Sequence, residues 1–242
     1  MYLKKLDVIC GFEELRKKEF NELARVVTES FLQHNKQFEL PGIKEIHITA
    51  LPIQFNNVEV LHNNTFKYFV GAKLPLDFSR FWEKNLKGKK HDILNLIEEG
   101  GTLIIDQLYD TYSSKEYIRN LNKTCECTLA NGFKWDGFWV PKSRKQDKIG
   151  ENIKIYYKYQ DEKRKLSTYL VTPKKKIYLG SVWSFKDYVE KLAEKANMIN
   201  KDEVIITPSE YLGFKVIVNI PKEVIIIEGE TPRWFTSALA EV

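Results

Sequence analysis

Three residues have the types and spacing for metal-dependent chemistry on a phosphodiester. Asp136 is followed twenty-five residues later by the triplet Asp161-x-Lys163. In many metal-dependent nucleases two such carboxylates hold Mg²⁺, while the lysine helps to position the attacking water. However, short triplets recur by chance in a chain with 29% charged residues, and DEKRK (161–165) has the pattern of a hairpin tip rather than a rigid strand. A nuclease site at Asp136, Asp161 and Lys163 is therefore kept as an alternative.

Other metal ligands are sparse. None of the four histidines lies in an H-x-H, H-x-D, H-x-E or H-E-x-x-H motif: His34, His47, His62 and His91. Cys125-x-Cys127 lacks the second pair that a tetrahedral zinc site needs. On a strand, these two thiols would share one face and pack together. We therefore expect no metal and no cofactor.

Motifs of other enzyme classes are also missing from the sequence. No G-x-S-x-G, P-loop or G-x-G-x-x-G occurs. His47-Ile48-Thr49 stands alone, whereas a phosphodiesterase with two His-x-Thr/Ser motifs needs a second copy. Whether the protein is an enzyme stays open, and a non-catalytic role is favoured.

The segment NGFKWDGFWVPKSRKQDK (131–148) combines four aromatic rings with a cluster of basic side chains. The spacing of its rings indicates a strand with a buried face, and Pro141 can end that strand. If instead the segment forms a binding surface, the candidate binding residues are Trp135, Trp139, Lys142, Arg144 and Lys145.

The chain from Lys142 to Lys176 is strongly basic. It carries twelve Lys or Arg against four Asp or Glu, although the net charge of the whole chain is only +5. Such a local excess attracts anionic partners, but lysines that guard edge strands against aggregation are the simpler explanation. Tyrosines interleave with these lysines and could stack bases, although strands favour tyrosine in any case: Tyr156, Tyr157, Tyr159, Tyr169 and Tyr178.

The elements that would position these residues follow from periodicity and capping. Apolar residues at helical spacing predict a helix over 12–33. Alternation predicts strands over 43–55 and 65–74, and Asp77 can cap a helix to residue 86. A further helix over 92–99 is expected to end at Gly100-Gly101.

Beyond these glycines we expect mostly strands. TLIIDQL (102–108) has the pattern of a buried strand, followed by a helix near 114–121 and a strand near 124–130. Strands then dominate from Lys134, with one helix over 184–197 and three strands after it. The predicted fold class is α+β: a mostly antiparallel sheet or partly closed β-barrel with helices packed outside. We expect a single unit over 1–242, with a soft division into 1–75 and 76–242 or near Gly101.

Residues 78–170 resemble cupin-like JmjC proteins. The resemblance rests on FSRFWEKNL (78–86), HDILNLIEEGGTLIIDQLYDTYSS (91–114), YIRNLNKTCECTLANGF (117–133) and IKIYYKYQDEKRKLSTYL (153–170). It implies a cupin-like barrel with an iron held by His-x-Asp and a distant His. Here QDKIGEN replaces the His-x-Asp motif and no histidine follows His91. The resemblance therefore implies a metal-free relative. If the protein is an enzyme, we expect a phosphodiester hydrolase rather than an iron oxygenase.

Two functions are compatible with the sequence. The first is a non-catalytic binding protein on a degenerate cupin-like scaffold, with a peptide or protein partner. The alternative is a Mg-dependent nuclease or nucleic-acid-binding protein that uses Asp136, Asp161, Lys163 and the basic stretch 142–176. The sequence has no apolar run of about 20 residues, no signal-peptide-like start and only three cysteines, so we expect a cytoplasmic protein without membrane contact. It leaves the oligomeric state open.

Overall fold

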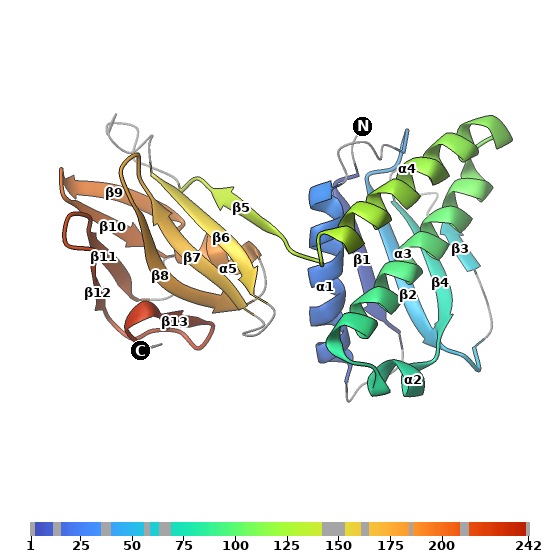
Figure 1. Ribbon diagram of the computed structural model, residues 1–242, viewed down its shortest axis with the longest axis horizontal. Coiled ribbons are helices and arrows are strands. Elements are labelled where there is room, and N and C mark those ends of the chain that lie inside the picture. The colour runs from blue at the N-terminus through green and yellow to red at the C-terminus, as the bar shows by residue number, and fades with distance from the viewer. Residues whose placement is uncertain are drawn as a thin grey trace. The chain divides into compact units, whose positions relative to one another are not determined.

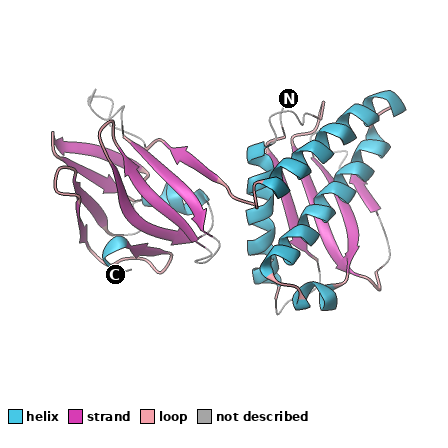
Figure 2. Cartoon of the chain, viewed as in Figure 1, coloured by secondary structure: helices cyan, strands magenta, loops and turns pink. Residues whose placement is uncertain are grey.

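The computed structural model describes residues 3–11, 16–34, 40–55, 59–62, 69–141, 153–160, 165–183, 186–208 and 213–240. The chain divides into two compact units, Met1–Trp135 and Asp136–Val242. Helices are concentrated in the first unit and strands dominate the second (Figure 2). The sequence analysis expected one unit with a soft division after residue 75, whereas the structure divides further along the chain, because the helices after residue 75 pack onto the first sheet.

The first unit contains a mixed four-stranded sheet in the order β1-β2-β4-β3. Its strands are β1 (Lys5–Cys10), β2 (Glu45–Pro52), β3 (Glu59–His62) and β4 (Phe69–Leu76). β2 pairs in parallel with β1 and β4, and β3 pairs antiparallel with β4. The alternating residues Leu6, Val8 and Cys10 of β1 are buried, so the sheet presents an apolar face to the helices.

The described part of the first unit also contains four helices (Figure 1). They are α1 (Lys17–His34), α2 (Phe78–Glu83), α3 (Leu86–Leu108) and α4 (Thr111–Ala130). α1 packs on β1, α3 packs on β2 and β4, and α4 packs on both α1 and α3. Side chains of Asp77, Asn85 and Asp110 accept hydrogen bonds from backbone N–H groups in the first turns of α2, α3 and α4. The predicted cap at Asp77 is thus confirmed.

The predicted strands over 102–108 and 124–130 are wrong, because both segments are helical. Gly100 and Gly101 lie inside α3 instead of ending it, where the lack of a side chain permits close packing. A Cβ at Gly100 would lie 3.0 Å from Ile48 Cδ1, and one at Gly101 would lie 2.8 Å from Leu121 Cδ2. The two glycines therefore bring α3 close to the sheet and close to α4.

The second unit is built mainly from two antiparallel sheets. The five-stranded sheet has the order β13-β8-β7-β6-β5 and the four-stranded sheet the order β12-β11-β10-β9. The strands of the first sheet are β5 (Asp136–Trp139), β6 (Lys154–Gln160), β7 (Lys165–Val171), β8 (Lys176–Trp183) and β13 (Phe235–Ser237). Those of the second are β9 (Lys195–Asn200), β10 (Glu203–Thr207), β11 (Lys215–Asn219) and β12 (Val224–Glu228). The α+β class and the mostly antiparallel pairing are confirmed, and the sheets are open.

A short helix, α5 (Lys186–Leu192), separates β8 from β9. The predicted helix over 184–197 is therefore too long, because residues from Lys195 onward pair with β10 as a strand. At the C-terminal end, β13 pairs with β8 and leads into the short helix η3 (Ala238–Ala240). Within the described residues, no helix has the length and apolar character to cross a membrane.

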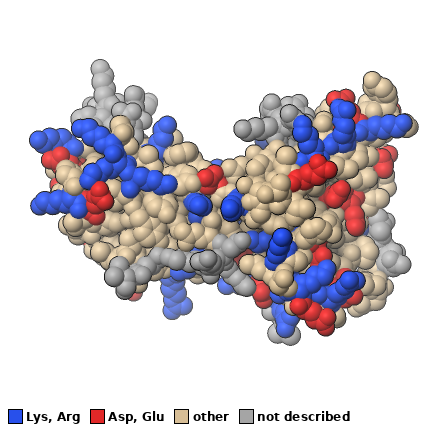
Figure 3. Space-filling view, viewed as in Figure 1, with Lys and Arg blue, Asp and Glu red and all other residues tan. Residues whose placement is uncertain are grey.

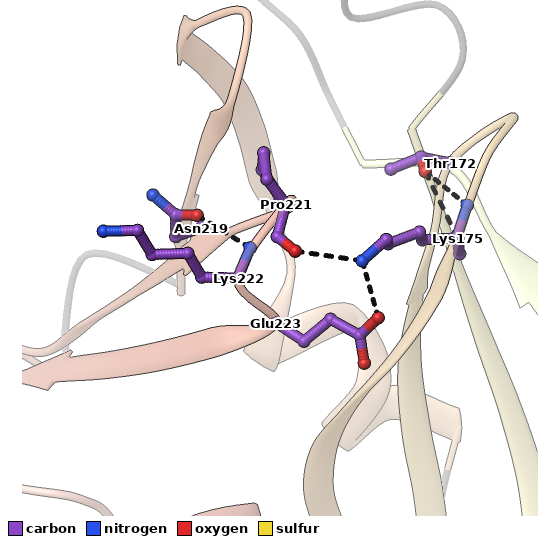
Figure 4. A network of polar contacts seen from close by, with 6 residues as sticks. All are labelled: Thr172, Lys175, Asn219, Pro221, Lys222 and Glu223. Carbon is purple, nitrogen blue, oxygen red and sulfur yellow. Dashed lines mark hydrogen bonds and ion pairs between the residues drawn. The ribbon is translucent and has the colours of Figure 1, made fainter.

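A polar clamp joins two turns of the second unit (Figure 4). In the β7–β8 turn, Thr172 Oγ1 accepts a hydrogen bond from the Lys175 backbone N–H at 3.0 Å. The ammonium group of Lys175 reaches the β11–β12 turn, where it bonds to the Pro221 carbonyl at 3.0 Å and to Glu223 Oε1 at 2.7 Å. The Lys222 backbone N–H donates to Asn219 Oδ1 at 3.1 Å, which closes the second turn.

Candidate functional site

The two candidate tryptophans belong to different units of the structure. Trp135 is 4% exposed, so its ring is not presented to a partner. Trp139 in β5 is half-buried, and its Nε1–H donates to the carbonyl of Ala193 at 2.8 Å. Trp139 is therefore held by the backbone of its own unit, and Trp135 is a buried ring.

Most of the predicted catalytic and basic residues fall outside the described residues: Lys142, Arg144, Lys145, Asp161 and Lys163. Asp136 is described, and it is an exposed residue of β5. Its Oδ2 accepts a hydrogen bond from the Tyr156 hydroxyl at 2.5 Å. Among the described residues there is no group of three or more His, Cys, Asp or Glu that could hold a metal ion.

An aromatic row crosses the five-stranded sheet from β5 to β8. Phe138 is in register with Tyr156, Tyr156 with Tyr169, and Tyr169 with Tyr178. Successive ring centroids along this row are 5.2, 5.8 and 5.2 Å apart. Phe138 is 58% exposed and the three tyrosines are half-buried. We call this row and the lysines beside it on the same face the tyrosine face.

Strand alternation explains why only some tyrosines belong to the tyrosine face. Tyr157 and Tyr159 are buried on the opposite side of β6, together with Ile155. Their neighbours Tyr156 and Lys158 point to the solvent side, since successive side chains on a strand alternate between faces. The sequence analysis grouped all the tyrosines as candidate stacking residues, and it missed Phe138 as a member of the row.

Lysines lie on both sides of the aromatic row. On β6, Lys154 and Lys158 are exposed two residues before and after Tyr156. Lys176 of β8 places its Nζ 3.7 Å from the ring centroid of Tyr156 and 4.5 Å from that of Tyr169. In Figure 3, Lys and Arg side chains gather near the β7–β8 turn, beside an area without charged side chains over β6 to β8. The site thus combines aromatic faces with positive charge.

The polar groups of the row are held in place by hydrogen bonds. The hydroxyl oxygens of Tyr178 and Ser181 are 2.9 Å apart. Burial, the hydrogen bond to Asp136 and the negative charge of that carboxylate together raise the pKa of Tyr156 to about 12. Tyr156 is therefore a neutral hydrogen-bond donor at ordinary pH, and its ring orientation is fixed by Asp136.

The residues of the first unit that the sequence analysis considered form separate local contacts. His47 Nδ1 lies 3.3 Å from Asp7 Oδ2, and the imidazole packs 4.4 Å from the ring of Phe69. Cys125 is buried and Cys127 is exposed, so the prediction that they share a face is wrong. The reason is that both lie on the helix α4, where residues two apart point in nearly opposite directions.

Comparisons with known proteins give no relative for this chain. No protein-family model matches it, and no curated protein or solved structure is significantly similar to it. Any functional conclusion therefore depends on the geometry of the chain itself.

Proposed function

We propose that the second unit is a non-catalytic nucleic-acid-binding module whose contact surface is the tyrosine face. One observation carries the proposal: four aromatic rings lie in register across four neighbouring strands, on a face bordered by exposed lysines. The sequence analysis favoured a non-catalytic binding protein and kept a nucleic-acid ligand as an alternative. The proposal combines the non-catalytic role with the nucleic-acid ligand.

Two different interactions would hold the ligand: bases stack on the aromatic rings, and phosphates are attracted by the lysines. Every base has a flat π-face, so stacking on an aromatic side chain contributes about 1–3 kcal/mol per base and tolerates any sequence. Lysines beside the rings attract the phosphate groups. The one carboxylate on this face among the described residues, Asp136, accepts a hydrogen bond from Tyr156.

Three expectations from the sequence remain predictions beside this proposal. A cupin-like scaffold is not needed for it, because the contact surface consists of neighbouring strands in one antiparallel sheet. A peptide or protein partner, and a nuclease site at Asp136, Asp161 and Lys163, are outcomes that the same experiments can detect.

The test is a binding titration with a fluorescently labelled oligothymidine at low and high salt. We expect binding that weakens steeply with salt, and that Tyr169→Ala weakens about 5-fold or more, since one stacked base is lost. Tyr169→Phe keeps the ring and should bind like the parent protein. Tyr112→Ala is the matched control, because Tyr112 is 85% exposed on a helix of the first unit.

Three results would contradict the proposal. These are no binding at low salt, equal effects of Tyr169→Ala and Tyr112→Ala, and complete competition by poly-glutamate. The last result would show a general preference for anionic chains, including acidic peptides, without a contribution from bases. Cleavage of the oligonucleotide in Mg²⁺, abolished by Asp136→Ala, would instead favour the nuclease.

A further inference from the structure

We infer that the ligand of the tyrosine face is single-stranded, and that its phosphates follow one side of the aromatic row, along Lys154, Lys174 and Lys176. This inference rests on the proposed function and specifies the form and path of the ligand. It follows from the spacing of the rings and from an asymmetry in the charges beside them.

The spacing of the rings requires separated bases. Neighbouring rings of the row are 5.2–5.8 Å apart. In a DNA helix, successive bases of one strand are about 3.4 Å apart and already stack on each other. Bases that each lie on a ring of this row must therefore be spread apart, as in extended single strands bound to aromatic platforms. A duplex offers no free base faces to the row.

The side of the row nearest the β7–β8 turn carries positive charge that is free for a ligand. Lys154 and Lys176 both align with Val171, one on each neighbouring strand. Lys174 follows in the exposed turn. In the described part of the chain, neither Lys154 nor Lys174 forms an ion pair, and Lys176 contacts only aromatic rings.

Lys175 lies between these lysines but is engaged elsewhere. Its ammonium group bonds to Glu223 at 2.7 Å and to the Pro221 carbonyl at 3.0 Å (Figure 4). This clamp pairs the carboxylate of Glu223 with Lys175 and fixes the turn. As a result, Lys174 and Lys176 stay available on either side of it.

The opposite side of the row is less favourable for phosphates. There Lys158 aligns with Asp136 on the neighbouring strand, so a carboxylate lies beside it. Further along, Lys165 donates from its Nζ to Thr236 Oγ1 at 2.9 Å and is therefore occupied. Because a phosphate is repelled by a carboxylate and attracted by unpaired ammonium groups, the path along Lys154, Lys174 and Lys176 is preferred.

The position of Lys176 shows that an ammonium group on the basic side of the row can reach the tyrosine rings. Its Nζ lies over the rings of Tyr156 and Tyr169. A phosphate bound by this ammonium group is therefore close enough for its own base to stack on either tyrosine. When a base arrives, the long and flexible lysine side chain can swing from the ring face to the phosphate.

The experiment measures how the affinity for a labelled oligothymidine depends on salt concentration. Each phosphate contact with a single strand contributes about −0.7 to the slope of log K against log [salt]. The double variant Lys154→Ala/Lys174→Ala should make the slope shallower by about 1.4, for two lost contacts. Lys87→Ala/Lys115→Ala, two exposed lysines on helices of the first unit, should leave the slope unchanged. A duplex of equal length should bind at least 10-fold more weakly.

The possible outcomes separate this inference from the proposed function. Equal slopes for both double variants, while Tyr169→Ala still weakens binding, would overturn the phosphate path but not nucleic-acid binding. A larger slope change with Lys158→Ala would place the phosphates on the opposite side. Duplex binding as tight as single-strand binding would overturn the single-strand inference. Absence of any binding would overturn the proposed function itself.

Discussion

The ammonium group of Lys176 lies 3.7 Å from the centre of the Tyr156 ring, although the two residues belong to strands that are not neighbours. The side chain starts on β8, passes the ring of Tyr169 on β7 at 4.5 Å and reaches β6. Such cation–π contacts contribute about 0.5–1 kcal/mol at exposed sites. This relationship links the aromatic row to the basic side of the tyrosine face.

The ionisation of Tyr156 should depend on Asp136. Burial, the hydrogen bond to Asp136 and its charge raise the pKa of Tyr156 from 10.0 to about 12. Because the folded value is the higher one, this group stabilises the fold fully below pH 10, and the contribution is lost as pH rises from 10 to 12. Asp136→Ala should lower the pKa of Tyr156, measured by NMR titration of ¹³C-labelled tyrosine. Tyr156→Phe assigns the resonance, and an unchanged midpoint would contradict the role of Asp136.

The three thiols should react at very different rates. Cys127 is exposed, whereas Cys10 and Cys125 are buried. Burial, with the nearby carboxylates of Glu98 and Glu126, also raises the pKa of Cys125 to about 12, so little thiolate forms. A thiol-reactive dye should therefore label one cysteine quickly in the native protein and all three after denaturation. Cys127→Ser should remove the fast reaction; two fast thiols would argue against the helical assignment of α4.

Gly180 should be required for the docking of β13. Its φ is +136°, and an added Cβ would lie 2.2 Å from the Thr236 carbonyl oxygen. Gly180→Ala should therefore lower the free energy of unfolding by about 2 kcal/mol or more, measured by chemical denaturation. Gly213→Ala is the control: its φ is +62°, but no atom lies within 4 Å, so only about 1 kcal/mol of backbone strain is expected. Equal losses in the two variants would show that β13 is not held in this way.

Gly100 should be needed for the packing of α3 on the sheet. Gly100→Val would push methyl groups into Ile48 and Leu74, whose atoms would lie 3.0–3.3 Å from the Cβ alone. We expect a loss of about 1–3 kcal/mol in the free energy of unfolding from overpacking. Gly88→Ala, in the first turn of the same helix, should stay within about 1 kcal/mol, because helix propensity offsets a contact of 3.2 Å with the Lys84 Cβ. A neutral Gly100→Val would mean that α3 does not rely on this close approach.

Local patterns predicted many elements well, because their signals lie within a few residues. The apolar spacing of Leu23, Val27 and Phe31 predicted α1, and all three side chains are buried. The cap at Asp77 and the hairpin between β6 and β7 were also predicted. The segment TLIIDQL was mispredicted because a short apolar run suits a buried strand and a buried helix equally. The Gly-Gly pair, interpreted as a helix end, is in fact a site of close packing within α3.

The candidate site was predicted only in part. The sequence indicated that tyrosines and lysines alternate after residue 153, and strand alternation already separates Tyr156 from Tyr157. It did not indicate which of the two faces is buried. The predicted binding residues Trp135 and Trp139 pack inside the protein or bond to its backbone, because large rings stabilise a core as readily as they bind a partner.

The sequence by itself determined the α+β class, the helix cap at Asp77, the alternation of the strands and the scarcity of closely spaced histidine and cysteine ligands, since each depends on neighbours within one element. The tertiary structure alone decided the boundary after Trp135, the helical state of 102–108 and the register that aligns Phe138 with three tyrosines from separate strands. Strand register depends on which face is buried against distant parts of the chain, and that burial depends on the whole fold.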